Sequence, residues 1–541
     1  MNYRALGSFG VFAALLLTGS LARAQEDDEE EAEDGQAEPA KPAEGEAKAE
    51  VKADATAKAP LSVPPTAAAA EPAEGAQTSV EAYEALRPPV YGKRGDWFIQ
   101  PYGYARFDAI VDSTQSFDDG LQPWLIQRAG TYRGSHRRAI FTARDSRFGI
   151  FVGAPEFHGL KTSGGIELDF YGLQVSDAKK HDQVVMGPLR LRLAYAKLET
   201  PVVDIIAGQY QEVFGWSSYF YPATVSYLGV PGELYHRNPQ FRIEKKIHSG
   251  KLELHTAIAA VRPGQRDAGG FPDGEAGIKL AHGGWSGIAS GGFGRPTVTP
   301  FQIGVSGLVR HFEVPAFDVD PGMEAQTTNG WGFAAQALIP IIPASTIDKK
   351  ANSLTATGEF SIGTGIADMY SGMDGGSRFP LLPNLAPQGS PAYVYPQNID
   401  PGLVTFDRTW TVATLNWKAF VVGAQYYLPF LDGNVWLAGI YSRTWSDNIK
   451  ELTPAASWGG IFTKMEYIDG TVGVQITPAL LMGFTFATQK QTFADVSAQT
   501  PNYGATPVPG VPGSTAGIPG TGGKPASARN NRGQFSVSFF F

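Results

Sequence analysis

The chain ends in Gly533-Gln534-Phe535-Ser536-Val537-Ser538-Phe539-Phe540-Phe541. Apolar side chains recur at every second position from Phe535 to Phe541, and the small polar residues Ser536 and Ser538 stand between them. Because successive side chains of a strand point to opposite faces, this spacing predicts a strand with one apolar face and one polar face. A strand of this kind that ends the chain on a free aromatic carboxylate indicates the closing strand of a transmembrane β-barrel.

A secretory signal peptide is predicted for residues 1–24. Arg4 supplies the positive charge, an apolar run spans residues 9–17, and Ala22-Arg23-Ala24 fits a small-residue cleavage site. The apolar run is too short to cross a bilayer, which takes roughly 18 residues or more. An exported chain of this kind is either soluble or a barrel, because only helices and closed barrels pair every backbone group within lipid.

The composition favours a barrel. The sequence has no cysteine, which excludes a disulfide framework, a lipid-modified cysteine and a thiolate metal site. It has 64 Gly, 10 Trp, 21 Tyr and 32 Phe, as suits tight turns and aromatic girdles at the two membrane interfaces.

The negative charge is confined to the N-terminal part of the chain. Residues 25–80 contain 15 acidic residues and 4 lysines, whereas acidic and basic residues balance from residue 81 onward. A segment so poor in apolar side chains cannot offset the entropy lost on ordering, so residues 25–95 are interpreted as a disordered, acidic, Ala/Glu/Pro-rich periplasmic segment. The absence of any basic excess argues against a nucleic-acid partner.

Residues 96–541 are predicted to form an all-β, antiparallel transmembrane barrel of about 16 strands. An even number places both termini on the periplasmic side. The alternation slips near Lys197, which predicts a bulge or an early strand end there. Boundaries are least clear at 274–300 and 400–420, so 14 or 18 strands remain open. The predicted strands are 98–111, 137–152, 160–173, 188–199, 203–211, 241–247, 251–258, 274–290, 300–312, 330–341, 352–364, 409–428, 434–445, 464–477, 479–491 and 533–541.

Short motifs add a family resemblance. The run 142–150, Thr-Ala-Arg-Asp-Ser-Arg-Phe-Gly-Ile, resembles the second strand of trimeric porins, and 159–169 fits the third strand that follows it. With Arg190-Leu-Arg-Leu-Ala-Tyr195, Ala207-Gly-Gln209 and Gln425-Tyr-Tyr-Leu-Pro429, the chain over 98–541 resembles the DcaP-like trimeric outer-membrane porins, which are related to the phosphate-selective porins O and P. The resemblance implies a sixteen-stranded homotrimer that takes up small anions, dicarboxylates among them. Such proteins usually carry an N-terminal coiled coil. This chain has the acidic segment in its place, so the sequence leaves the formation of a trimer undecided.

Basic residues dominate the predicted pore lining of the first six strands. Rings of Arg or Lys favour anions, and the Arg fork binds carboxylate or phosphate bidentately. The acids on the same wall are Asp108, Glu167, Asp169 and Glu244, so ion pairs that merely brace the wall are the alternative interpretation. Arg144 and Arg147 differ by three positions, so both face inward only if the strand is irregular between them. The pore-lining candidates are Arg106, Arg144, Arg147, Lys161, Glu167, Asp169, Arg190, Arg192, Gln209, Arg242 and Lys246.

The loop after the fifth predicted strand is rich in aromatic residues over 212–237. In porins this third extracellular loop folds inward and narrows the channel. We therefore expect Glu212, Tyr219, Tyr221 and Arg237 to line a constriction opposite the arginines. The alternative is an aromatic cluster that packs only within the loop or at a subunit contact.

Enzymatic and metal-binding patterns are absent from the sequence. The eight histidines lack metal-ligand spacing, and no Gly-x-Ser-x-Gly nucleophile elbow occurs. We therefore expect no enzyme activity, no cofactor and no metal.

The sequence favours a passive outer-membrane porin for small anions in a Gram-negative bacterium. Its expected partners are small solutes, outer-membrane lipids and lipopolysaccharide, and the barrel assembly machinery, which would read Phe539 and Phe541 as an assembly signal. The alternatives are a structural or adhesive barrel with a plugged lumen and a non-selective general porin.

Overall fold

A computed structural model describes residues 93–94, 97–117, 125–172, 189–215, 222, 224, 230–263, 270–290, 293–314, 326–373, 402–406, 411–453, 460–494 and 525–541. The predicted signal peptide and nearly all of the segment 25–95 lie outside these residues. Within the described part, no helix has the length and apolar character needed to cross a bilayer.

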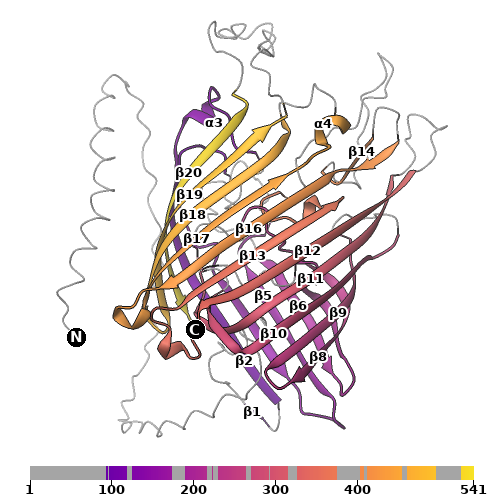
Figure 1. Ribbon diagram of the computed structural model, residues 1–541, viewed down its shortest axis with the longest axis vertical. Helices are drawn as coiled ribbons and strands as arrows, with labels where there is room; N and C mark the ends of the chain where they lie inside the picture. Colours follow the sequence, from indigo (N-terminus) through magenta and orange to yellow (C-terminus); the bar gives the residue numbers. More distant parts are fainter. Residues whose placement is uncertain are drawn as a thin grey trace, which may run out of the picture. The chain divides into compact units, whose positions relative to one another are not determined.

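The described chain forms one closed antiparallel barrel of sixteen strands, as predicted (Figure 1). Each wall strand pairs with the next along the chain, and the last strand pairs with the first. The second wall strand consists of two pieces, β3 and β4. The wall strands are β2 Trp97–Asp112, β3 Arg138–Thr142 with β4 Arg147–Gly153, β5 Lys161–Asp169, β6 Arg190–Glu199, β7 Asp204–Gln211, β8 Arg237–Ser249, β9 Leu252–Val261, β10 Asp273–Ala289, β11 Thr297–Val314, β12 Gln326–Ile342, β13 Leu354–Thr364, β16 Asn416–Tyr427, β17 Val435–Trp445, β18 Phe462–Thr477, β19 Leu480–Phe493 and β20 Ser527–Phe540.

The remaining elements are short. They are β1 Lys93–Arg94, α3 Tyr132–Ser135, η3 Ile347–Lys349, η4 Ala367–Met369, β14 Val404–Phe406, β15 Val412–Thr414, η5 Leu431–Gly433 and α4 Ile449–Leu452. The pair formed by β1 and the start of β2 lies partly within the segment that the sequence assigned to disorder.

The two ends of the barrel differ, and we name them the short-turn end and the loop end. Tight turns such as 250–251 and 478–479 join the strands at the short-turn end, and the C-terminus also lies there (Figure 1). The long connections, with α3, α4 and β14, lie at the loop end (Figure 1).

The C-terminal strand faces as its sequence predicts. Ser536 and Ser538 of β20 are fully buried inside the barrel, whereas Phe539 is 51% exposed on the outer face. Phe541 is also exposed, and its backbone exchanges two hydrogen bonds with Gly103 of β2. Large apolar side chains exposed around the outside of most wall strands make a surface suited to lipid rather than water. The strand begins at Ser527, six residues earlier than predicted.

The irregularity expected between Arg144 and Arg147 is present. Residues 143–146 leave the ladder, and the Ser146 backbone nitrogen donates to the Ala143 carbonyl at 2.9 Å. The break separates β3 from β4, and both arginines lie inside the barrel.

The bulge predicted near Lys197 lies instead at Arg192. Glu167 of β5 pairs with Leu193 while Leu168 pairs with Leu191, which leaves Arg192 as the extra residue. A bulge reverses the facing of every residue after it, so Tyr195 and Lys197 join the inner face. In the sequence, the alternation is visibly disturbed only near Lys197, several residues beyond the bulge.

The predicted strand 409–428 is divided in the structure. β16 begins at Asn416, and β15 pairs with β14 in a separate two-stranded sheet at the loop end. The Leu415 carbonyl accepts from the backbone nitrogen of Gly365, just after β13, at 2.9 Å, which fixes this small sheet beside the wall. A single alternating pattern in the sequence therefore covers two elements.

The barrel closes where β2 meets β20, and a buried ion pair holds that seam. Asp112 accepts from Arg532 Nε at 2.8 Å and Nη2 at 2.9 Å, and from Asn530 Nδ2 at 2.8 Å. Both charged side chains are nearly completely buried.

Replacing Asp112 by Ala is expected to destabilise the barrel by about 3–5 kcal/mol, because Arg532 would then be a buried charge without its carboxylate. Urea unfolding of the refolded protein in detergent, followed by tryptophan fluorescence, measures this change. The control is Asp447→Ala, which removes a partly exposed partner of Lys418 and should cost less than about 1 kcal/mol. Equal costs for the two variants would contradict the assignment of Asp112 to the seam.

Candidate functional site

The described residues of the third loop (212–215, 222, 224 and 230–236) lie inside the barrel. The loop leaves β7 and returns to β8, yet its described residues bond to strands on the other side of the ring. The Leu234 backbone nitrogen donates to Glu359 of β13 at 2.8 Å, and Ser442 of β17 donates to the Pro231 carbonyl. Thr224 donates to Asp469 of β18 at 2.7 Å. The expectation that this loop folds inward is confirmed.

The beginning of the loop is fixed by buried carboxylates. The backbone nitrogens of Val213 and Phe214 both donate to Glu275 of β10, at 2.8 and 3.1 Å. Glu212 is buried, and its carboxylate contacts His236 Nδ1 at 2.8 Å. Burial opposes the charged form of His236, but the contact with Glu212 outweighs it and raises the pKa of His236. Glu212 thus serves the loop anchor.

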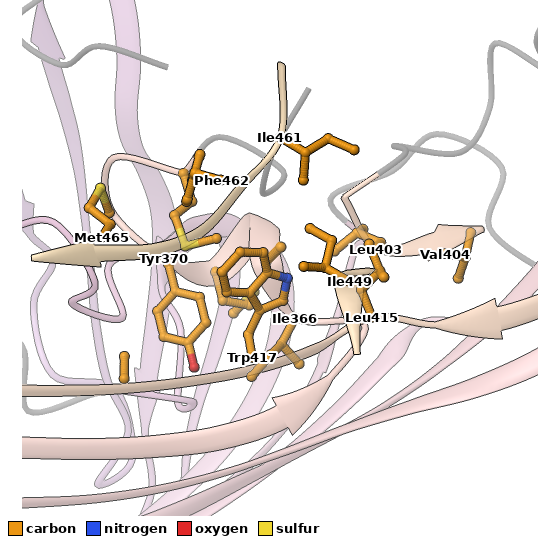
Figure 2. Packing of buried hydrophobic residues seen from close by; sticks show 14 of the residues in the cluster. Ile366, Tyr370, Leu403, Val404, Leu415, Trp417, Ile449, Ile461, Phe462 and Met465 are labelled. Carbon is orange, nitrogen blue, oxygen red and sulfur yellow. The ribbon is translucent and has the colours of Figure 1, made fainter. Parts of the chain in front are cut away.

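An apolar cluster fills the loop end beside β11–β20. Trp417 of β16 lies at its centre, with Phe462 at a ring-centroid distance of 5.9 Å (Figure 2). Tyr370, which follows η4, and Ile449 of α4 pack against it from the connecting segments (Figure 2). Phe214 and Leu234 join the cluster from the third loop. This side of the lumen is therefore occupied by packed side chains.

The opposite side, formed by β2–β8, carries charged residues, and one group of them gathers beside the returning end of the third loop. Arg192 donates to Glu167 Oε1 at 2.7 Å and to Asp169 Oδ2 at 2.9 Å. Arg190 holds Asp169 bidentately, at 3.0 and 2.6 Å. We name this group the arginine cluster: Arg147, Arg190, Arg192 and Arg237, with Glu167, Asp169 and Tyr235.

Tyr235 is the meeting point of the arginine cluster. Its hydroxyl accepts from Arg192 Nη2 at 3.0 Å and from Arg237 Nη1 at 2.7 Å. Burial disfavours the phenolate, but the charges of Arg192, Arg237 and Arg147 stabilise it more and lower the pKa of Tyr235 to about 7. Within the described residues, the arginine cluster combines four guanidinium groups with the carboxylates of Glu167 and Asp169.

Two further groups extend the charged wall. Arg106 of β2 pairs with Asp108 at 2.9 Å and with Asp145 at 2.7 Å. Arg144 donates to the Phe170 and Gly172 carbonyls. Nearer the short-turn end, Arg242 pairs with Glu244 at 2.6 Å. Several arginines thus do brace the wall, as the alternative interpretation held, and the arginine cluster holds the largest group of guanidinium groups described above.

The remaining predicted residues have different placements. Lys246 lies on the inner face near the short-turn end, and Lys161 lies on the inner face of β5 but is exposed at that end. The prediction that Gln209 lines the pore is wrong. Gln209 shares the outer face with Ala207, and its amide donates to the Leu191 carbonyl at 2.8 Å. It braces the bulge at Arg192 and does not line the lumen. Tyr219 and Tyr221 lie outside the described residues.

Two contributors to the charged wall were missed. Asp145 sits in the break between β3 and β4, where alternation predicts no facing at all. Tyr235 was not singled out within the loop. The only signal was its place two residues before Arg237, at the start of a strand.

No group of three or more His, Asp or Glu residues that could hold a metal ion occurs in the part of the chain the structure covers.

No protein-family model matches the chain, and no curated protein matches it in sequence. Among solved structures, the outer membrane channel DcaP of Acinetobacter baumannii superposes with a TM-score of 0.52. The match covers 83% of this chain and 99% of that one, at 16% sequence identity. The chain has the fold of that channel. The resemblance inferred from the order of the motifs is thus confirmed at the level of the fold.

Other outer-membrane proteins match less closely. The anion-selective porin from Comamonas acidovorans has a TM-score of 0.43 at 9% identity, with 82% of this chain and 100% of that one covered. A trimer form of OmpT from Vibrio cholerae has a TM-score of 0.41 at 10% identity, with 83% and 100% covered. The fold assignment therefore rests on the DcaP structure.

The shifted pKa of Tyr235 predicts a pH-dependent charge. Above a pH of about 7 its hydroxyl becomes anionic, so the arginine cluster loses one unit of positive charge as pH rises. If ions pass this cluster, preference for chloride over potassium should fall between about pH 6 and pH 8. His236 also loses positive charge as pH rises. The acids that face the arginines of the cluster are Glu167 and Asp169.

Tyr235→Phe isolates the tyrosine, because it removes the ionisable hydroxyl and leaves the ring. Reversal potentials measured at both pH values should depend less on pH in this variant, while the contribution of His236 remains. An unchanged pH dependence would assign the effect to His236 alone.

Proposed function

We propose that this protein is an outer-membrane porin for the passive diffusion of small, preferably anionic solutes. The path would run between the inward-folded third loop and the charged wall of β2–β8. The observation that carries the proposal is the convergence of Arg192 and Arg237 on the Tyr235 hydroxyl, beside the guanidinium groups of Arg147 and Arg190.

The chemistry of this wall favours carboxylate and phosphate groups. A guanidinium presents a planar fork that matches two oxygens, and it stays charged at any physiological pH. Arg190 has 38% of its side chain exposed, against 12% for Arg147 and 2% for Arg192, and it lies toward the loop end. It is placed to meet an incoming anion before the buried Arg192 does. Dicarboxylates and phosphate-like solutes are therefore the proposed cargo.

The proposed location and orientation of the barrel follow from its outer surface and from the sequence. Apolar side chains around the barrel suit a bilayer, and the short-turn end with the C-terminus would face the periplasm of a Gram-negative bacterium. The segment 25–95 would lie in the periplasm after removal of the signal peptide. Lipopolysaccharide and outer-membrane lipids would surround the barrel, and its assembly machinery would recognise Phe539 and Phe541. A homotrimer is proposed from the family resemblance.

A structural barrel with a plugged lumen is the second candidate, because the apolar cluster around Trp417 fills part of the interior. The two functions differ in conductance: a porin carries a stepwise current across a planar bilayer, whereas a plugged barrel carries none. A non-selective porin would conduct without preferring chloride.

The double variant Arg190→Glu/Arg237→Gln tests the proposal. It removes two positive charges and adds one negative charge while keeping the fully buried Arg192 in place. The reversal potential across a KCl gradient should indicate chloride preference in the original protein and shift toward potassium in the variant. Succinate and phosphate should reduce the chloride current of the original protein more than that of the variant.

The matched control is Arg133→Glu, a charge reversal on the exposed helix α3 at the loop end. It should leave the reversal potential nearly unchanged. Equal preference for chloride and potassium in the original protein, or an unaltered potential in the double variant, would refute the anion-selective role. Absence of current from folded barrels would favour the structural candidate.

A further inference from the structure

Residues 293–295, in the described part of the turn between β10 and β11, also lie inside the barrel at the short-turn end. Phe293 is 8% exposed, and its ring lies 6.1 Å from that of Trp436 at the start of β17. It belongs to a second apolar cluster whose other members lie at or near strand ends. These members are Ile288, Ala344, Tyr427, Trp436, Ala438 and Leu481.

The turn reaches the opposite side of the ring. β10 is the eighth wall strand and β2 is the first, so the two lie across the barrel from one another. Nevertheless, the guanidinium of Arg106 in β2 lies 5.5 Å from the Phe293 ring centroid. The guanidinium of Arg295 lies 5.2 Å from the ring centroid of Phe540 in β20. A turn that only joined neighbouring strands would make neither contact.

These contacts connect the turn to the arginine cluster. The Phe540 ring lies 5.3 Å from the Tyr104 ring, and the Arg147 guanidinium lies 5.3 Å from the Tyr104 ring centroid. The rings of Tyr104 and Phe540 therefore lie between the guanidinium groups of Arg147 and Arg295. Attraction between each cation and the neighbouring ring helps to position the guanidinium.

We propose that the turn carrying Phe293 and Arg295 forms a second constriction, and that the Arg295 guanidinium forms a second station for the same small anions. The third loop narrows the path beside the arginine cluster, and this turn narrows it again before the short-turn end. This inference rests on the proposed function, because it concerns the path that the solute takes. It assigns specificity to a turn that connects two adjacent strands.

The sequence contains no cysteine, so a single introduced thiol can be labelled selectively. Arg295→Cys would be reacted in a planar bilayer with a negatively charged and, separately, a positively charged methanethiosulfonate. The negative label should lower the single-channel conductance stepwise and shift the reversal potential toward potassium. The positive label should also narrow the path but restore chloride preference. The original protein should respond to neither reagent.

Lys349→Cys is the matched control, because Lys349 is an exposed cation of η3 at the same end of the barrel. Its labelling should leave the current unchanged. Phe293→Ala provides a second variant that introduces no thiol: loss of its ring should raise the conductance by widening the second constriction.

The outcomes separate the two proposals. If the original protein conducts with chloride preference but fully labelled Arg295→Cys behaves like labelled Lys349→Cys, the second constriction is refuted and the proposed function stands. A thiol at position 295 that stays unreactive in conducting barrels also refutes it, because a solute in the path would be equally excluded. An original protein that carries no current refutes both.

Discussion

Closure of the ring is the constraint on which every other feature depends. Inside a bilayer no water can pair with a backbone group, so each strand must have a neighbour on both sides. The chain meets this requirement by pairing β20 with β2, from Tyr104 with Phe540 to Asp112 with Arg532. Once the first and last strands are joined, outward side chains must be apolar and inward ones are free to be polar. The charged wall can exist only because lipid never reaches it.

The described interior combines apolar clusters with buried polar groups, such as Arg310 of β11 with Asp273 and Asp368. Beside β11–β20, apolar side chains from the wall and from the connecting segments form packed clusters at both ends. Beside β2–β8, charges and tyrosines line the wall. Arg192 is almost fully buried, yet it has two carboxylates and a hydroxyl around its guanidinium, so its burial is compensated. The described residues of the third loop connect these two regions. Its anchors lie on β13, β17 and β18, and its returning end carries Tyr235, which contacts the arginine cluster.

Much of this architecture can be predicted from the sequence, and the failures have physical causes. Alternation reveals the sixteen strands because each strand has one lipid face and one inner face, and it locates arginines such as Arg106 and Arg242 correctly. It fails for the position of the bulge at Arg192, because a bulge reverses facing without leaving a mark in local composition. Gln209 was predicted from a family motif, but it faces outward on the regularly paired strand β7. Alternation also merges β15 with β16, since two successive strands with one turn residue between them look like one.

The charged site itself is less predictable than the wall that carries it. Asp145 lies in a break of the strand, and Tyr235 lies in a loop, so neither has a facing that periodicity can supply. Which arginines are neutralised depends on distances between residues far apart in the chain. Arg106 and Arg192 look equivalent in sequence, but only the second shares its neighbourhood with a loop that brings a further guanidinium.

The anchoring of the third loop has a mechanical consequence. A hollow cylinder of hydrogen-bonded strands resists stretching along each strand, but it flattens easily when squeezed from the side, because only the angles between strands change. The loop spans the hollow from the root on β7 to Glu359, Ser442 and Asp469 on three different strands. Links of this kind across a ring oppose flattening of its cross-section, because they fix the distance between opposite walls.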